Sequence, residues 1–365
     1  MTADPLGDVF PYALELSRAL GAEHIHVVLA VMGGPMSPSQ RMAVAGLANL
    51  ELRVSRYRLE WMEDPWAELD EAGHWLLSLA AETRPDLVHL NSYGHAALPF
   101  DCPTVIVAHS CILSWWRAVH GVPAPDEWQR YRSWVLDGLR SASALVAPSR
   151  AMAAALVQEY GEAAANCRII YHGRAAEPFR ASRAKREQVL AASRLWDEAE
   201  NLAVLESAAT RLTWPVRVAG ASADPHARSR PARHLVLLGT LSEAQLLEEL
   251  AAAAIFAAPA RYEPFGLTIL DAALSGCALV LGDIASLREL WDGAARFVSP
   301  ADPDALTDAL KRLAADRPAR LALAAAARAR AAQLSIDRMA SGYLTLYREL
   351  RSSDPRRPIG GAALY

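Results

Sequence analysis

Two carboxylates, Glu263 and Asp271, are separated by seven residues around the start of a predicted helix. An apolar strand is expected to end near Ala258, with the helix beginning near Gly266 and closing at Gly276. The first backbone N–H groups of a helix have no partner inside it, so this one could bind an anion such as phosphate. Those amides belong to Phe265, Gly266 and Leu267. Asp271 could reach neutral hydroxyls; the alternative is a capping Glu263 and a surface Asp271.

Two more side chains follow predicted strands. Arg194 comes after the apolar run 188–192, where its guanidinium could make a forked contact with a diphosphate or could simply be exposed at a helix start. His109 ends the run 104–108, and a single His is more often a structural hydrogen-bonding group than a catalyst. Because ligands of open parallel sheets gather at the carboxyl ends of the strands, both positions favour a binding site.

Alternating strands and helices must position these residues. Apolar runs predict buried strands at 26–31, 87–90, 104–108, 144–147 and 168–171. Helical periodicity separates the runs, for example at 9–20 and 127–139. After the polar, basic stretch 177–187, a second set of strands is predicted at 188–192, 215–219, 234–238, 255–258 and 278–281. Long helical patterns at 303–334 and 336–350 end the chain.

The length of 365 residues suits two domains at about 150 residues each. We therefore expect an α/β protein in which two Rossmann-like parallel-sheet domains face a central cleft. The first domain would cover 1–180 and the second 188–335, joined by a linker at 181–187. A C-terminal helix and tail would occupy 336–365.

Composition excludes several classes of protein. With 52% apolar and 21% charged residues, the chain is typical of a soluble folded protein and not of a disordered one. A net charge of −4 provides no general basic field, so no nucleic-acid partner is expected. The sequence has no apolar run long enough to span a membrane, no secretory signal and no CxxC pair among its four cysteines. We expect a cytoplasmic protein without a transmembrane segment.

The motif around Glu263 and Asp271 resembles a known family. Its acid-x7-acid spacing, within Tyr-Glu-Pro-Phe-Gly-Leu, is similar to the signature of the family 4 retaining glycosyltransferases, which have the two-domain GT-B fold. The resemblance covers nearly the whole chain and includes the segments 2–7, 105–109, 146–150 and 343–350 together with Arg194. It implies transfer of a sugar from a nucleoside diphosphate sugar to an acceptor hydroxyl, and a C-terminal helix that packs back on the first domain. No metal is expected, because Arg194 and the helix amides would stabilise the departing diphosphate.

The resemblance also implies roles for individual residues. Glu263 would contact hydroxyls of the donor sugar, Asp271 would hold the ribose diol, and His109 would lie near the donor sugar and the acceptor. The catalytic set would be His109, Glu263 and Arg194. The donor-binding set would be Gly7, Arg194, Glu200, Glu263, Pro264, Phe265, Gly266, Leu267 and Asp271. Trp115 or Trp116 could stack on a glycan, lipid-linked or small-molecule acceptor.

Three positions depart from the family pattern. Glu200 stands where the family places a Lys directed at the diphosphate, Asp8 where a second Gly is common, and Asp271 where the second acid is usually Glu. The alternative function is therefore a catalytically weakened relative that binds a nucleotide sugar or a glycan. A nicotinamide oxidoreductase would need a G-x-G-x-x-G after a strand, which this sequence lacks.

The start of the chain is a further departure. Family members have an apolar first strand before the loop at 2–7, whereas here Met1 alone precedes it. Such a strand is normally central, and neighbouring strands without it would expose unpaired backbone groups. We expect either a start codon further upstream or another segment of the first domain filling that place.

Overall fold

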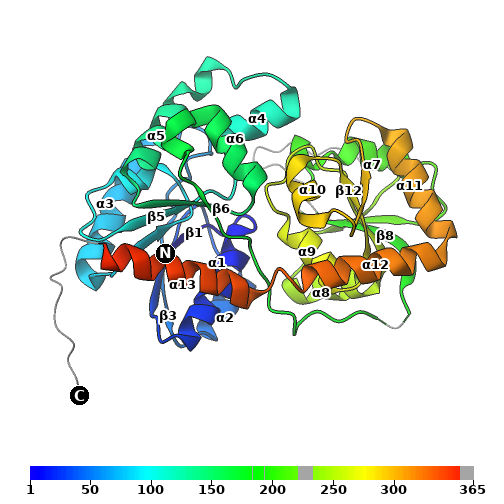
Figure 1. The fold of residues 1–365 in the computed structure, drawn as a ribbon, viewed down its shortest axis with the longest axis horizontal. Coiled ribbons are helices and arrows are strands. Elements are labelled where there is room, and N and C mark those ends of the chain that lie inside the picture. The colour runs from blue at the N-terminus through cyan, green and yellow to red at the C-terminus, as the bar shows by residue number, and fades with distance from the viewer. Residues whose placement is uncertain (183, 193, 221–232, 354–365) are drawn as a thin grey trace.

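The computed structural model describes residues 1–365 except 183, 193, 221–232 and 354–365. Two α/β domains lie next to each other (Figure 1). All pairings between the described strands are parallel, as expected for strands whose apolar runs are buried on both faces. The predicted fold class of two parallel-sheet domains is confirmed.

The first domain has a sheet in two parts. One part has the order β3-β2-β1 and the other β4-β5-β6-β7. The strands are β1 (Thr2–Ala3), β2 (Val27–Val31), β3 (Leu50–Val54), β4 (Val88–Leu90), β5 (Thr104–Val107), β6 (Ala144–Ala147) and β7 (Arg168–Ile169). The helices are α1 (Val9–Ala22), α2 (Pro38–Ala45), α3 (Trp66–Thr83), α4 (Ile112–His120), α5 (Gln129–Ser141) and α6 (Arg150–Tyr160). Three 3₁₀ turns complete the domain: η1 (Gly94–Ala97), η2 (Asp126–Trp128) and η3 (Gly161–Ala164).

Thr2 and Ala3 themselves occupy the place of the first strand. They pair with Ala30 and Val31 of β2. On the other side, the backbone N–H of Asn91 donates to Thr2 Oγ1 at 2.9 Å, and the Asn91 amide donates to the Thr2 carbonyl oxygen at 2.6 Å. The side chains of Thr2 and Asn91 thus satisfy a backbone N–H and a backbone carbonyl between β1 and β4, and Thr2–Ala3, which we predicted as part of a loop, form a short strand there.

The second domain has a six-stranded sheet in the order β10-β9-β8-β11-β12-β13. Its strands are β8 (Arg186–Ala192), β9 (Val216–Ala219), β10 (Val236–Gly239), β11 (Ala253–Ala258), β12 (Ala278–Gly282) and β13 (Arg296–Val298). Its helices are α7 (Leu202–Ala209), α8 (Glu243–Ala252), α9 (Leu267–Leu274), α10 (Ala285–Trp291), α11 (Pro303–Ala315) and α12 (Arg317–Ala331), with the 3₁₀ turn η4 (Glu198–Glu200). The strand order reverses between β8 and β11, which is where doubly wound sheets bind ligands.

Some predicted boundaries differ from the structure. The single helix predicted at 303–334 is two helices, because Asp316 caps α12 by accepting from Ala319 N–H at 2.9 Å and Pro318 has no N–H to donate. Strand β8 begins at Arg186, inside the predicted linker 181–187. Arg183 of that linker and residues 354–365 of the predicted tail lie outside the described residues.

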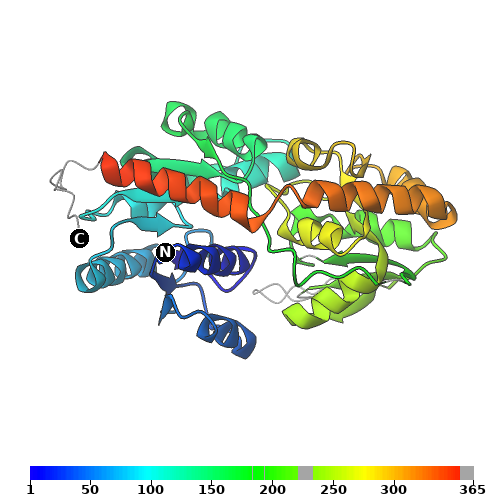
Figure 2. The same cartoon turned by 60° about the horizontal axis from the view of Figure 1, so that its bottom comes forward.

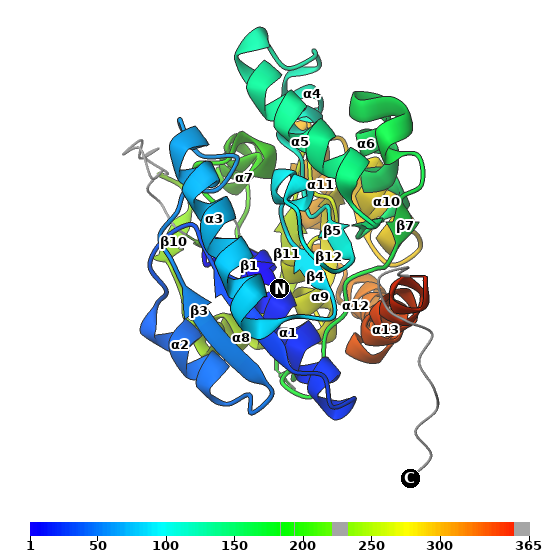
Figure 3. The same cartoon turned by 90° about the vertical axis from the view of Figure 1, so that its left-hand side faces the viewer.

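Helix α13 (Ile336–Ser352) returns to the first domain, as the family resemblance implied. Figures 2 and 3 show it alongside that domain, and it packs against α1. The Tyr347 hydroxyl lies 2.6 Å from His89 Nδ1, and Glu349 pairs with Arg168 of β7 at 2.6 Å. The predicted return of the C-terminal helix is confirmed.

Candidate functional site

The loop between β11 and α9 carries Glu263. Its Oε1 accepts from Phe265 N–H at 3.2 Å. Gly266 has φ +84, and a Cβ there would lie 2.7 Å from Ile269 Cδ1 and 3.4 Å from Glu263 Cγ, so only glycine fits this turn without strain. Burial and then the charge of Asp8 raise the pKa of Glu263 to about 7, although hydrogen bonding to Phe265 N–H opposes the rise. Helix α9 starts and ends where the sequence predicts.

Arg194 follows β8 and lies opposite the first domain. Its guanidinium pairs with Asp197 at 3.0 Å and is half exposed. A Cβ on Gly7 would lie 4.0 Å from Nη1 of Arg194, so the loop after β1 approaches this guanidinium from the other domain. Burial lowers the pKa of Arg194, but the charges of Asp197 and Glu200 outweigh it and the pKa is raised. Arg194 thus faces an excess of carboxylates.

Glu200, the last residue of η4, belongs to the same cluster. Burial raises the pKa of its carboxyl to about 8. The positive charge of Arg194 opposes this rise, whereas the charges of Glu263 and Asp197 add to it. At pH 7 the Glu200 carboxyl is therefore mainly neutral. The structure brings Gly7, Arg194, Glu200 and Glu263 together at the carboxyl ends of the two sheets.

Asp271 accepts hydrogen bonds from a residue that no sequence pattern predicted. Arg174, which follows β7, donates from Nε and Nη2 to the two Asp271 oxygens, at 2.8 Å each. Both side chains are buried, and Glu15 of α1 lies 4.0 Å from Arg174. The pair joins segments 97 residues apart, and no local pattern marks it. Any contact between Asp271 and a ribose would use lone pairs that the guanidinium leaves free.

His109 lies in a partly buried chain of polar groups. Its Nε2 is 2.9 Å from Asn91 Oδ1, and its Nδ1 is 3.2 Å from Nε2 of His172. Since Asn91 Oδ1 only accepts, His109 carries its proton on Nε2 and accepts from His172 at Nδ1. Burial lowers the pKa of His109 to about 3, so the ring is neutral. Both ring nitrogens have partners within the first domain, and no sequence pattern predicted a role for Asn91 or His172.

Trp115 and Trp116 lie on α4 and have different surroundings. Trp115 Nε1 donates to Asp197 Oδ1 across the two domains at 3.0 Å. The carboxylate that pairs with Arg194 therefore also binds an indole of the first domain. Trp116 Nε1 is buried without a hydrogen-bond partner, and its ring lies 4.5 Å from that of His120. The structure connects Trp115, but not Trp116, to the cluster around Arg194.

The first domain also has an open cavity of about 500 Å³ at the carboxyl end of β3. It is lined by Val54, Ser55, Arg56, Tyr57, Glu68, Glu71 and Trp75, none of which is among the predicted site residues. Within the described parts of the chain, no group of three or more His, Cys, Asp or Glu side chains is arranged to hold a metal ion. None of the described helices is long and apolar enough to cross a membrane.

Comparisons with known protein structures support the GT-B fold. Sucrose-phosphate synthase from Thermosynechococcus elongatus superposes with a TM-score of 0.76 at 18% identity, covering 97% of this chain and 96% of that one. The Anabaena protein HepE in complex with UDP-glucose superposes with a TM-score of 0.76 at 16% identity, covering 96% and 99%.

Comparisons of sequence identify the family. Residues 9–177 match the model for Glycosyltransferase Family 4, and residues 186–316 match the model for Glycosyl transferases group 1. Glycogen synthase from Mycobacterium tuberculosis is 29% identical over 317 residues, which cover 77% of this chain and 74% of the relative. Together with the two-domain fold and the Glu263 loop, these matches show that the chain belongs to the family 4, group 1 glycosyltransferases.

Proposed function

We propose that this protein is a retaining glycosyltransferase that moves a sugar from a nucleoside diphosphate sugar to an acceptor hydroxyl. The proposal rests on one observation: Arg194, Glu263 and the start of α9 lie close to the Gly7 loop of the other domain. A cation and helix amides lie there beside carboxylates, which suits a ligand with a diphosphate at one end and sugar hydroxyls at the other.

Arg194 and the amides at the start of α9 would bind the diphosphate and stabilise it as it leaves, without a metal ion. The Glu263 carboxylate would accept hydrogen bonds from donor-sugar hydroxyls. His109 would line the site as a neutral ring of fixed orientation, because both of its nitrogens are already hydrogen-bonded, to His172 and to Asn91. The leaving phosphate oxygen would then take the acceptor proton.

UDP-glucose is the first donor to test, because the similar HepE structure holds it. A carbohydrate is the first acceptor to test, because the similar mycobacterial protein is a glycogen synthase. Trp115 would be the aromatic contact for that acceptor, since its indole N–H already reaches the Asp197 carboxylate beside Arg194.

A second candidate is a weakened relative that binds a nucleotide sugar without efficient transfer. It is favoured by Glu200, which lies beside Arg194 and Glu263 where the family has a Lys. The raised pKa of Glu200 reduces its repulsion of a diphosphate near neutral pH, so this candidate predicts weak donor binding chiefly above pH 8.

Two measurements separate the candidates. Thermal shift with a panel of nucleotide sugars finds the donor, since a ligand at 100 times its dissociation constant stabilises by about 2.7 kcal/mol. Donor hydrolysis and transfer are then measured with the donor that binds. Binding with turnover supports the enzyme; binding without turnover for any acceptor supports the binding protein.

A further inference from the structure

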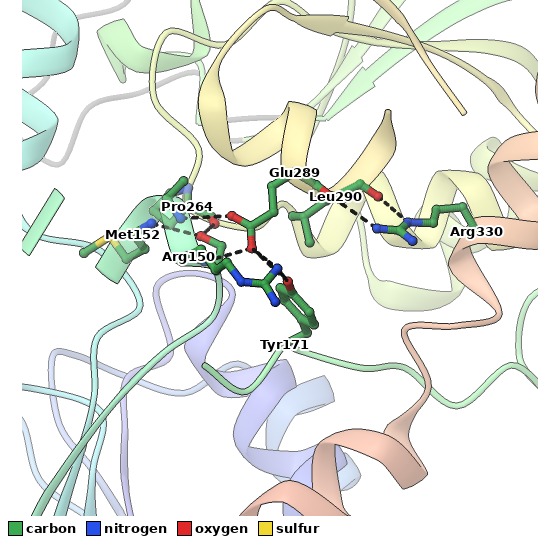
Figure 4. A network of polar contacts seen from close by, with 9 residues as sticks. Arg150, Met152, Tyr171, Pro264, Glu289, Leu290 and Arg330 are labelled. Carbon is green, nitrogen blue, oxygen red and sulfur yellow. Dashed lines mark hydrogen bonds and ion pairs between the residues drawn. The ribbon is translucent and has the colours of Figure 1, made fainter. Parts of the chain in front are cut away.

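A network of hydrogen bonds joins the first turn of α6, in the first domain, to the second domain (Figure 4). Ser149 is the N-cap of α6: its Oγ accepts from Met152 N–H at 3.1 Å and donates to the carbonyl oxygen of Pro264 at 2.7 Å. Pro264 lies in the loop that carries Glu263. Ser149 is fully buried, so water does not compete for this bond while the domains are together.

Glu289 of α10 binds the same helix start. Its Oε1 accepts from Arg150 N–H at 2.8 Å, and its Oε2 accepts from Ala151 N–H at 2.9 Å. The Tyr171 hydroxyl donates to Oε1 at 2.9 Å. A carboxylate at a helix N-terminus is favoured by the helix dipole as well as by the free amides. The second domain therefore supplies the acceptor for two of the first three amides of α6.

Helix α10 is also fixed to the loop at 263–266. Ser286, three residues before Glu289, donates to the carbonyl oxygen of Glu263. Arg330 of α12 donates to the carbonyl oxygens of Leu290 at 2.7 Å and Glu289 at 3.2 Å. Since α6 binds Pro264 and α10 binds Glu263, a shift of one helix against the other would move the backbone of this loop.

We propose that Ser149 and Glu289 are positioning residues, which hold the two domains together and fix the backbone of the Glu263 loop for sugar transfer. The proposal rests on the glycosyltransferase function proposed above. The α6 amides and the Glu289 carboxylate can meet only while the two domains lie together as they do in this structure, so we expect these contacts to act on the transfer step, which needs both domains. The proposed contact of Arg194 with the nucleotide comes from the end of β8, which neither Ser149 nor Glu289 touches, so nucleotide binding depends less on these contacts than transfer does.

The test compares Glu289→Ala, Glu289→Gln and Ser149→Ala with Asp292→Asn as the matched control. Asp292 ends the same helix, is exposed and contacts Arg288 at 3.6 Å, so its substitution removes a similar charge without touching α6. The interdomain distance is measured in the ligand-free protein by energy transfer between one dye on each domain. Steady-state transfer and UDP titration give kcat and the dissociation constant for UDP, and thermal unfolding checks that each variant is folded.

We expect Glu289→Ala to favour the open arrangement and to lower kcat by about tenfold or more, as expected for the loss of charged hydrogen bonds. The dissociation constant for UDP should change less than about threefold. Ser149→Ala should also lower kcat, and Glu289→Gln, which keeps one acceptor oxygen, should be intermediate. Asp292→Asn should match the wild type.

An unchanged interdomain distance in Glu289→Ala would overturn the proposal, as would equal losses of kcat and of UDP affinity. An effect of Asp292→Asn as large as that of Glu289→Ala would overturn it as well. The distance measurement needs no transferase activity. A wild type that transfers no sugar would therefore contradict the proposed function, while the distance still decides whether Glu289 holds the domains together.

Discussion

Donor binding should weaken above pH 8 because Glu200 ionises there. With its pKa at about 8, the carboxyl is roughly one tenth ionised at pH 7 and nine tenths ionised at pH 9. A carboxylate about 4 Å from a phosphate is repelled by about 4 kcal/mol at an effective dielectric of 20, so the donor binds essentially the neutral form. The apparent dissociation constant for the donor should then rise about tenfold between pH 7 and pH 9.

Isothermal titration with UDP-glucose measures this rise, since its diphosphate stays fully ionised over the range. Glu263 also titrates here, with a pKa of about 7, so Glu200→Gln is the required comparison. This variant keeps the size of the side chain and removes its ionisation, and its donor affinity should vary much less with pH. Glu200→Lys should bind at least as tightly at pH 7 and about tenfold more tightly than the wild type at pH 9.

The raised pKa of Glu200 also makes the stability of the folded protein depend on pH. The folded protein holds the Glu200 proton up to about pH 8, whereas an unfolded Glu loses it near pH 4.5, so stability falls as pH rises between these values. Glu200→Gln should therefore stabilise the protein more at pH 9 than at pH 5. Donor affinity that is flat from pH 7 to pH 9 in the wild type, or that falls equally in Glu200→Gln, would refute the reasoning.

Three further outcomes are expected. Glu263→Gln should lower turnover far more than affinity for UDP, because Glu263 would face the sugar; equal losses in kinetics and titration would contradict that role. Asp271→Ala removes both short hydrogen bonds of the buried Arg174 and leaves it, among the described carboxylates, only Glu15 at 4.0 Å, so it should cost about 3 kcal/mol in urea unfolding, which a loss below about 1 kcal/mol would contradict. Gly266→Ala should destabilise by about 1–2 kcal/mol, since φ is +84 and Ile269 lies in the way; unchanged thermal unfolding would count against it.

Local sequence patterns predicted most of the strands and helices. Short apolar runs between helical segments, such as Ala144–Ala147, favour buried strands, and the structure has that strand at the same residues. Strand β3 was not predicted, because the predicted strands were continuous apolar runs. In β3 the leucines alternate with Glu51 and Arg53, and most of its residues are only half buried. The break at Asp316 was missed because apolar periodicity continues on both sides of it.

The site was less accessible to sequence reasoning, because its residues meet only after folding. The Glu263 loop could be found since its acids, Gly266 and the helix start are close in sequence. Arg174 on Asp271 and Glu289 on the α6 amides could not, since both contacts join distant segments and neither residue type is unusual at its position. The hydrogen-bond partner of His109 Nδ1 is likewise distant in sequence, since His172 lies 63 residues away.

The most direct test of the central claim follows the reaction by proton NMR. Wild-type protein is incubated with a maltooligosaccharide acceptor and one donor at a time, in the presence of EDTA. The donors are UDP-glucose and any other nucleotide sugar found by thermal shift. We predict donor consumption and a new glycosidic bond with the anomeric configuration of the donor, both lost in Arg194→Met. An inverted product, or a donor that binds but is never consumed, would contradict it.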